Sequence, residues 1–252
     1  MGAIIFSDVH ADAAAVGALA ACIRDPSFYE TIGPVDLLVN LGDLLHRGSR
    51  PQETLEKVHT LSQEFRLMSV LGNHDHAFLH GILVSGSDAA STYRHEQLRD
   101  SPLLSIFNTM PMEWSDQGML FVHGGPLDLG TQTLRLKCWQ RLSHESGDFF
   151  TGYHYTAPMA FDNLGERGLT HMCCGHQHEH ICCRKTATGI VQHELDFQPV
   201  NLGMDRKIQL DVARVSLDVP TILRVGGCHG YAPEFAYTDF KTFSFIRFAS
   251  RS

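Results

Sequence analysis

The chain has 252 residues, of which 43% are hydrophobic and 19% are charged, and its formal net charge is −8 at pH 7. This composition is that of a folded globular protein, and the length allows one α/β domain with a substantial core or two small domains. The acidic balance argues against a protein that binds along a nucleic-acid backbone without sequence preference.

The first residues run directly into an apolar strand, without a basic leader or an apolar stretch long enough to cross a bilayer. We therefore expect a cytoplasmic protein with no membrane partner. Gly2 is followed by Phe6 rather than by Ser or Thr at that position, so the myristoylation pattern is absent. Seven cysteines are an odd number in a chain that needs no covalent cross-links, and we expect reduced thiols. The sequence does not indicate an oligomeric state.

The amino-terminal half alternates between strand and helix patterns. The apolar run at residues 3–10 is followed by an alanine-rich helical stripe at 12–23, which ends before Pro26. A second buried strand is predicted at 37–41, and Pro51 stands where proline is tolerated at the start of the next helix. This alternation implies a largely parallel sheet with right-handed crossovers.

Five apolar runs are each followed by side chains of the metal-ligand type. The runs and the residues after them cover 3–10, 37–43, 65–75, 119–125 and 169–178. Because the carboxyl ends of parallel strands meet at one edge of a sheet, we expect these side chains to converge there. They are Asp8, His10, Asp43, Asn73, His123, His176 and His178. A single Zn²⁺ needs about four ligands, whereas this set suits two ions about 3.5–4 Å apart with one bridging carboxylate.

The remaining segments are less regular. Residues 93–110 predict further helix, interrupted near Pro102, and the segment 131–161 is rich in aromatic residues and histidine. We expect that segment to be either a lid or specificity insert, or a helix and loop packed on the sheet. As a lid it would offer Trp139, Tyr153 and Tyr155 for stacking on a base or an aryl group.

From residue 181 onward the pattern is one of short strands with turns, at 190–195, 208–212 and 243–248. No linker or internal repeat is visible, and the candidate ligands come from both halves of the chain. We therefore expect a single domain over residues 1–252.

The five motifs are Asp-x-His, Gly-Asp-x-x-x-Arg-Gly, Gly-Asn-His-Asp, Val-His-Gly-Gly and Gly-His-x-His, and they span residues 8–178. In type and in order they resemble those of the calcineurin-like metallophosphoesterase family. The resemblance implies an α/β fold, a four-layer αββα sandwich of two mixed β-sheets flanked by helices. It also implies a hydrolase that cleaves a phosphomonoester or phosphodiester by attack of a metal-bridging hydroxide.

The resemblance further implies a division of the ligands between two ions. The first ion would take Asp8, His10 and His178, the second would take Asn73, His123 and His176, and Asp43 would bridge them. Oxygen and nitrogen ligands of this kind suit Mn, Fe or Zn without choosing among them. Two such ions add about four positive charges, so the acidic chain remains compatible with a phosphoester substrate.

Two further residues have implied roles, and a third departs from the pattern. His74 would lie near the leaving-group oxygen as a general acid or a charge stabiliser, and Arg47 would bind the phosphate with both ends of its guanidinium. Protein-phosphatase members have Asp where this chain has His46. An imidazole cannot replace a carboxylate as the acceptor for a protonated His74, so Asp75 or another residue orients it, or its pKa is set differently.

The substrate stays open at this level. Gly-Asp-Leu-Leu-His-Arg-Gly and Val-His-Gly-Gly favour a phosphoprotein phosphatase of the Ser/Thr type or a dinucleoside-tetraphosphate hydrolase, whereas Gly-His-Gln-His favours the small bacterial phosphodiesterases. A non-catalytic scaffold on the same fold is the remote alternative. The pairs at 173–174 and 182–183 are not spaced as a zinc site, and we expect buried apolar cysteines rather than a metal or redox cluster.

Overall fold

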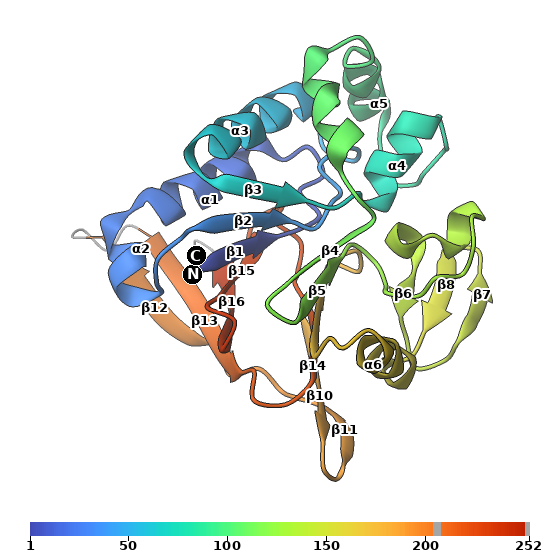
Figure 1. Cartoon of the computed structure of the whole chain (residues 1–252). Helices are drawn as coiled ribbons and strands as arrows, with labels where there is room; N and C mark the ends of the chain where they lie inside the picture. The colour runs from blue at the N-terminus through green and yellow to red at the C-terminus, as the bar shows by residue number, and fades with distance from the viewer. Residues whose placement is uncertain (204–207, 250–252) are drawn as a thin grey trace.

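The computed structural model describes residues 1–203 and 208–249, and two large mixed sheets form its centre (Figure 1). The first sheet has the order β12 (Gln198–Leu202), β13 (Ile208–Ser216), β16 (Thr242–Phe248), β15 (Glu234–Thr238), β1 (Ala3–Phe6), β2 (Leu37–Asn40) and β3 (Arg66–Ser69). The second has the order β11 (Gly189–Gln192), β10 (Ile181–Thr186), β14 (Thr221–Arg224), β9 (His171–Cys174), β5 (Met119–Val122) and β4 (Glu113–Asp116).

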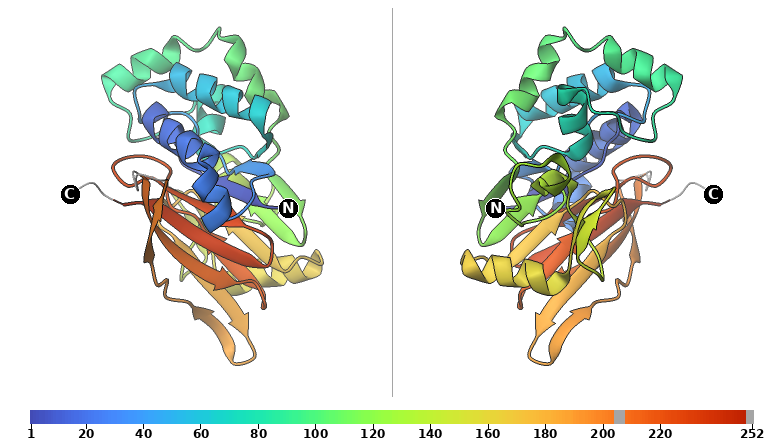
Figure 2. Two further views of the ribbon diagram at one scale, coloured as in Figure 1. Left: turned by 90° about the vertical axis from the view of Figure 1, so that its left-hand side faces the viewer. Right: turned by 90° about the vertical axis from the view of Figure 1, so that its right-hand side faces the viewer.

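In the two large sheets, parallel pairing involves all the strands that lead into the predicted ligands. In the first sheet β1, β2 and β3 are parallel, and in the second β9 lies parallel to both β5 and β14. The other pairs in these two sheets are antiparallel, and β10 and β11 extend from the body of the molecule as a hairpin (Figures 1 and 2). The sheets are therefore mixed, as the predicted sandwich requires, and the parallel alternation ends where the short carboxyl-terminal strands begin.

Helices cover the outer faces of both sheets, which gives the four layers. They are α1 (Ala13–Arg24), α2 (Pro26–Thr31), α3 (Pro51–Glu64), α4 (Asn73–His80), α5 (Ala89–Glu96) and α6 (Ala157–Glu166), with the 3₁₀ turns η1 (Pro102–Thr109), η2 (Thr133–Arg135) and η3 (Lys137–Trp139). In the part of the chain that the structure describes, no helix combines the length and the apolarity needed to cross a membrane.

Side chains alternate along the strands to build three apolar layers. Ile4 and Phe6 of β1 pack under α1 and α3, whereas Ala3 and Ile5 face the second sheet. On the outer side of that sheet, residues from β5, β9 and β14 pack against α6. A strand buried on both faces reads as a continuous apolar run, which is why β1, β2, β5 and β9 are visible in the sequence.

The predicted helices at the amino-terminal end agree closely with the structure. Asp12 caps α1 by accepting hydrogen bonds from the backbone N–H of Ala14 and Ala15, both at 3.1 Å. Pro51 occupies the first turn of α3, as predicted. The helical pattern at 93–110 corresponds to α5, which begins earlier, at Ala89, and to the 3₁₀ turn η1, which begins at the predicted break.

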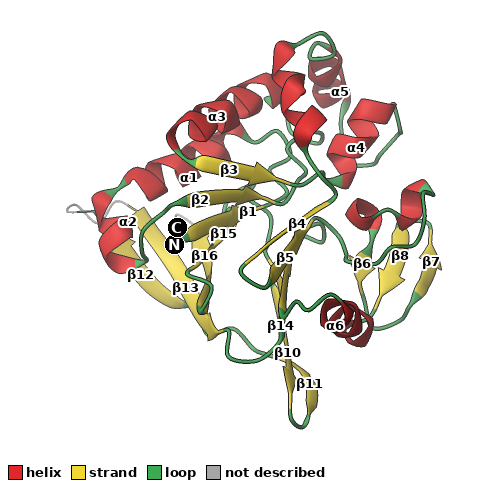
Figure 3. Ribbon diagram, in the orientation of Figure 1, coloured by secondary structure: helices red, strands yellow, loops and turns green. Residues whose placement is uncertain are grey.

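The segment 131–161 forms a small sheet of its own (Figure 3). Its strands are ordered β6 (Arg141–Leu142), β8 (Gly152–Tyr155) and β7 (Gly147–Phe149), and α6 begins before the segment ends. Tyr155 is fully buried and Trp139 is only 8% exposed. Tyr155 packs against strands of the second sheet and Trp139 packs against Ala77 of α4. Neither ring is therefore free to stack on a ligand, as it would be in a lid.

Candidate metal centre

The loops that follow β1, β2 and β9 converge, and their backbones are unusual. Asp8, His10, Asp43, His176 and His178 all have positive φ angles, between 50° and 70°. Non-glycine residues seldom adopt this left-handed conformation, and it persists where surrounding contacts enforce it. The conformation turns the side chains away from the strand direction and into one shared space.

Close packing of the loops explains two of the glycines in the motifs. A Cβ on Gly42, whose φ is +100°, would lie 2.4 Å from the backbone nitrogen of Gly72. A Cβ on Gly72 would in turn lie 2.2 Å from the backbone nitrogen and from a carboxylate oxygen of Asp43. The loops after β2 and β3 therefore approach each other directly only because both positions are glycine.

Two of the histidines are oriented by backbone carbonyl groups. The Nδ1 atom of His123 lies 2.7 Å from the carbonyl oxygen of Leu41, and that of His10 lies 3.2 Å from the carbonyl oxygen of Leu45. A proton on Nδ1 satisfies each carbonyl and leaves Nε2 as the free lone pair. Metal-binding histidines are commonly held in this way.

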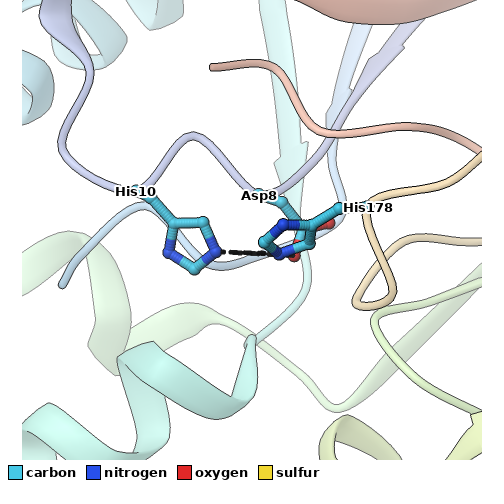
Figure 4. A group of neighbouring side chains, drawn as sticks. All are labelled: Asp8, His10 and His178. Carbon is cyan, nitrogen blue, oxygen red and sulfur yellow. Dashed lines mark hydrogen bonds and ion pairs between the residues drawn. The ribbon is translucent and has the colours of Figure 1, made fainter. Parts of the chain in front are cut away.

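Figure 4 shows the first group, in which Asp8 and the imidazoles of His10 and His178 face one another. The two Nε2 atoms are 3.0 Å apart, and that of His178 lies 3.2 Å from Oδ1 of Asp8. The backbone N–H of His176 donates to Oδ2 of Asp8 at 2.8 Å, which fixes the carboxylate. This is the set predicted for the first ion.

The second group surrounds Asp43. Its Oδ2 atom lies 3.3 Å from Nε2 of His123 and 3.9 Å from Nε2 of His10. Nε2 of His123 also lies 3.0 Å from Oδ1 of Asn73, and His176 completes the cluster. The structure thus brings all seven predicted ligands together, with Asp43 between the two groups.

Three buried polar atoms in this space have no hydrogen-bond partner among the residues that the structure describes. They are Oδ1 of Asp8, Oδ2 of Asp43 and Nε2 of His176. A buried polar atom without a partner is costly, and a cation would satisfy all three. Carboxylate oxygens and imidazoles are ligands that Mn, Fe and Zn accept, so the residues fit the implied pair of metal ions.

The protonation states suit cation binding with one exception. Burial would raise the pKa of Asp43, but the neighbouring imidazoles, His123 foremost, hold it well below its usual range. Burial lowers the pKa of His10 to about 3, and burial and the charge on His123 lower that of His176. Although burial opposes it, Asp43 raises the pKa of His123 to about 9, so His123 must release a proton to bind a metal.

Asp75 forms hydrogen bonds with the backbone of the neighbouring loops and not with His74. Its carboxylate accepts hydrogen bonds from the backbone N–H groups of Asp43 at 2.8 Å, Leu45 at 3.1 Å and Gly72 at 3.3 Å. Burial and the charge on Asp43 raise its pKa to about 7. Asp75 therefore holds the loops after β2 and β3 together, and the first alternative for orienting His74 does not apply.

Arg47 lies at the border of the centre. Its Nη2 atom is 3.3 Å from Nε2 of His74, and its Nη1 atom is 3.4 Å from Nε2 of His178. The ring of His46 lies 5.4 Å from that of His74, and the Nδ1 atoms of both rings lack a partner. The structure thus brings together Arg47, the predicted phosphate ligand, His74, predicted to lie near the leaving-group oxygen, and His46.

Two residues near the centre carry no signal in the sequence. Arg141 in β6 is partly buried, and its positive charge contributes to the lowered pKa of His176. His229, from the loop after β14, places its Nε2 atom 3.3 Å from Nδ1 of His178. Neither residue belongs to a motif, and both reach the centre only through the folding of distant segments.

The small sheet is fastened to the loops of the centre. The side-chain amide of Gln177 accepts from the N–H of Leu142 at 2.9 Å and donates to its carbonyl oxygen at 3.1 Å. The hydroxyl of Tyr155 donates to the carbonyl oxygen of Gly124 at 2.8 Å, and the N–H of Gly125 donates to the carbonyl oxygen of Lys137. These bonds join the segment to the loops that carry His123 and His176.

The fold is an α/β sandwich of four layers, and the seven converging side chains form candidate metal-ligand groups. The family model of the calcineurin-like phosphoesterases matches residues 1–180, and the chain therefore belongs to this family. Among curated proteins, none matches the sequence of this chain.

Several solved structures share the fold. A metallophosphoesterase from Sphaerobacter thermophilus is 22% identical, with a TM-score of 0.64 over 100% of this chain and 89% of its own. A protein serine/threonine phosphatase from Saccharomyces cerevisiae is 13% identical, with a TM-score of 0.59, and the match covers 100% of this chain and 81% of the phosphatase. A candidate diadenosine tetraphosphatase is 14% identical, with a TM-score of 0.52, and the match covers 96% of this chain and 92% of the other protein. At these identities the likeness concerns the fold.

Proposed function

We propose that the chain is a phosphoesterase that works with two metal ions, one on each side of Asp43. The observation that carries this proposal is the Oδ2 atom of Asp43, which is buried, lacks a hydrogen bond and faces both His10 and His123. An oxygen shared by two groups of ligands is what a bridging carboxylate requires. Membership of the family supports phosphoester hydrolysis as the reaction.

Two bound ions would activate a water molecule and offset the charge on the phosphoryl oxygens. The chain's own residues would bind and orient the phosphate. Arg47 stands where its planar guanidinium can donate two hydrogen bonds to phosphate oxygens, and Arg141 adds a second positive charge nearby. Both charges strengthen the preference for an anionic substrate.

His74 completes the proposed site. It lies beside Arg47, and burial lowers its pKa, so the imidazole is neutral at pH 7. Because Arg47 can only donate, its bond to Nε2 of His74 places the imidazole proton on Nδ1. His74 would meet the leaving-group oxygen once a substrate takes over the bond to Arg47.

Metal content and activity together test the proposal. We expect about two ions of Mn, Fe or Zn per chain in the wild type, and hydrolysis of p-nitrophenyl phosphate or its bis ester. The Asp43→Asn variant should lose both ions and the activity, because the remaining carboxylate, Asp8, belongs to one group only. Elemental analysis and initial rates on both esters measure this.

The matched control is Asp162→Asn, which removes an exposed carboxylate from α6, away from the centre. This variant should keep its metal content and activity. One tightly held ion in the wild type would refute the two-metal arrangement, and two ions without hydrolysis of either ester would refute the enzymatic function. The ratio of the two rates separates a monoesterase from a diesterase.

A further inference from the structure

A cavity of about 370 Å³ adjoins the metal centre on the side of His229. His10 and Arg47 belong both to its wall and to the centre, and the wall also includes Ser49, Arg50 and His229. We propose that this cavity binds a second phosphate of the substrate, next to the one held at the metal centre. The proposal rests on the proposed function and names the class of substrate, a compound with two linked phosphates.

The charge of the cavity supports an anionic occupant. Arg47 and Arg50 line it, and Asp12 is the one acidic residue in the wall. Both oxygens of Asp12 are engaged, Oδ1 with the amino-terminal N–H groups of α1 and Oδ2 with the N–H of Gly230 at 3.0 Å. The wall of the cavity therefore carries two guanidinium groups against one carboxylate, although the whole chain carries a net charge of −8.

Arg47 links the cavity to the centre. Its guanidinium contacts His74 and His178 in the centre and also lines the cavity. The substrate phosphate at the metal centre and the phosphate linked to it would both contact the guanidinium of Arg47. Bidentate binding of phosphate oxygens by arginine makes such sharing geometrically reasonable.

Arg50 is available to the second phosphate. Its side chain is 48% exposed, and its ion pair is with Glu53 at 3.6 Å, one turn along the same segment. Exposed pairs of this kind contribute little free energy, so an anion in the cavity can compete for the guanidinium. Arg50 is thus poised to distinguish one phosphate from two.

The opposite wall is held in place by the fold. The loop after β14 is fixed where the N–H of Cys228 donates to the carbonyl oxygen of Ser7 at 2.8 Å and the N–H of Gly230 donates to Asp12. These bonds place the ring of His229 5.6 Å from that of His10. The cavity is consequently formed before a ligand arrives, which favours specific binding.

The test compares two probes that the enzyme does not consume, inorganic phosphate and methylenediphosphonate. Calorimetric titration of the metal-loaded wild type should show methylenediphosphonate binding at least about tenfold more tightly, the effect of one additional charge-assisted hydrogen bond. The Arg50→Gln variant should lose most of this advantage while its affinity for phosphate changes little. Metal content is measured after each titration, because diphosphonates bind free cations.

Arg94→Gln is the matched control, since it removes a nearby exposed guanidinium that does not line this cavity. It should leave the ratio of the two dissociation constants unchanged. Equal affinities in the wild type, or an unchanged ratio in Arg50→Gln, would overturn the subsite while leaving the phosphoesterase proposal intact. Failure of the wild type to hydrolyse either p-nitrophenyl ester would instead refute the proposed function.

Discussion

His74 and His46 form a pair of facing imidazoles beside the proposed phosphate position. Burial, followed by the charges on His74 and His95, lowers the pKa of His46 to about 4. Burial also lowers the pKa of His74, and no carboxylate accepts from its Nδ1 atom. Both rings are therefore mostly neutral at pH 7 in the free chain. To donate a proton, His74 must first gain one on Nε2 when a substrate displaces Arg47, and His46 supplies none of the negative charge that would favour this protonated form.

Replacing His74 by Asn tests whether it donates a proton to the leaving group. We expect substrates with poor leaving groups to slow by roughly 10²–10⁴-fold, the usual contribution of general acid catalysis. Hydrolysis of p-nitrophenyl phosphate should slow much less, because its leaving group needs little protonation. Metal content should stay constant, and His76→Asn, a change on the same helix, serves as the control.

His46→Asp is the companion variant. A carboxylate beside His74 favours the imidazolium and raises its pKa, so the alkaline limb of the pH–rate profile should move upward. If both kinds of leaving group slow equally in His74→Asn and the profile of His46→Asp does not move, His74 positions the phosphate instead of donating a proton.

At the scale of elements, the segment around α5 holds the loop that carries Arg47. His46 and Arg47 have φ angles of 65° and 63°, so their backbone needs external support. The N–H of His46 donates to Nε2 of His95 at 2.7 Å, and the N–H of Arg47 donates to the hydroxyl of Ser87 at 2.9 Å. The carbonyl oxygen of Ser91, 2.7 Å from Nδ1 of His95, fixes the ring.

Loss of the acceptor at His95 should therefore misplace Arg47. We expect His95→Phe to raise KM for a phosphoester several-fold, up to about tenfold, the range that one hydrogen bond supplies, with a smaller change in kcat. His95→Gln retains an acceptor oxygen and should recover most of the wild-type KM. Equal KM values in the two variants, at equal thermal stability, would show that His95 only fills space.

Some of the strands could be predicted from the sequence and others could not. The strands before Asp8, Asp43 and His123 are apolar on both faces, so their positions and their ligands were predictable together. β6 has two residues and β7 begins at a glycine, and neither has a periodicity that distinguishes strand from loop. Arg141 therefore stayed unassigned, because its place near the centre depends on the bonds between Gln177 and Leu142.

At the scale of the whole molecule, the order of the strands in the second sheet could not be derived from local patterns. His229 follows β14, a four-residue strand that lies between β9 and β10 in this sheet, and both of these strands precede β14 in the chain. Such order comes from long-range pairing, which periodicity does not encode. The seven ligands could be predicted because motifs mark them, whereas the walls around them depend on this non-local order.

The cysteines are distributed through the same layers. Cys173 and Cys182 lie between the two sheets, and Cys174 and Cys183 lie on the opposite face, toward α6. This alternation confirms the expectation of buried apolar cysteines, since adjacent residues of a strand face opposite ways. All seven thiols lie in the described part of the chain and are buried and free.

Burial of the thiols leads to a prediction about the molecule as a unit. It raises the pKa of Cys22, Cys182 and Cys228 to about 12, so these thiols stay protonated and unreactive at pH 8. Ellman's reagent should label less than one thiol per native chain within minutes and all seven after denaturation. Because the pKa of these thiols is raised by folding, burying them as neutral groups stabilises the native state. This stabilisation is complete below about pH 9 and is lost as the pH rises toward 12. Rapid labelling of one or two thiols in the native protein at pH 8 would contradict the buried arrangement and would revive a redox role for the cysteine pairs.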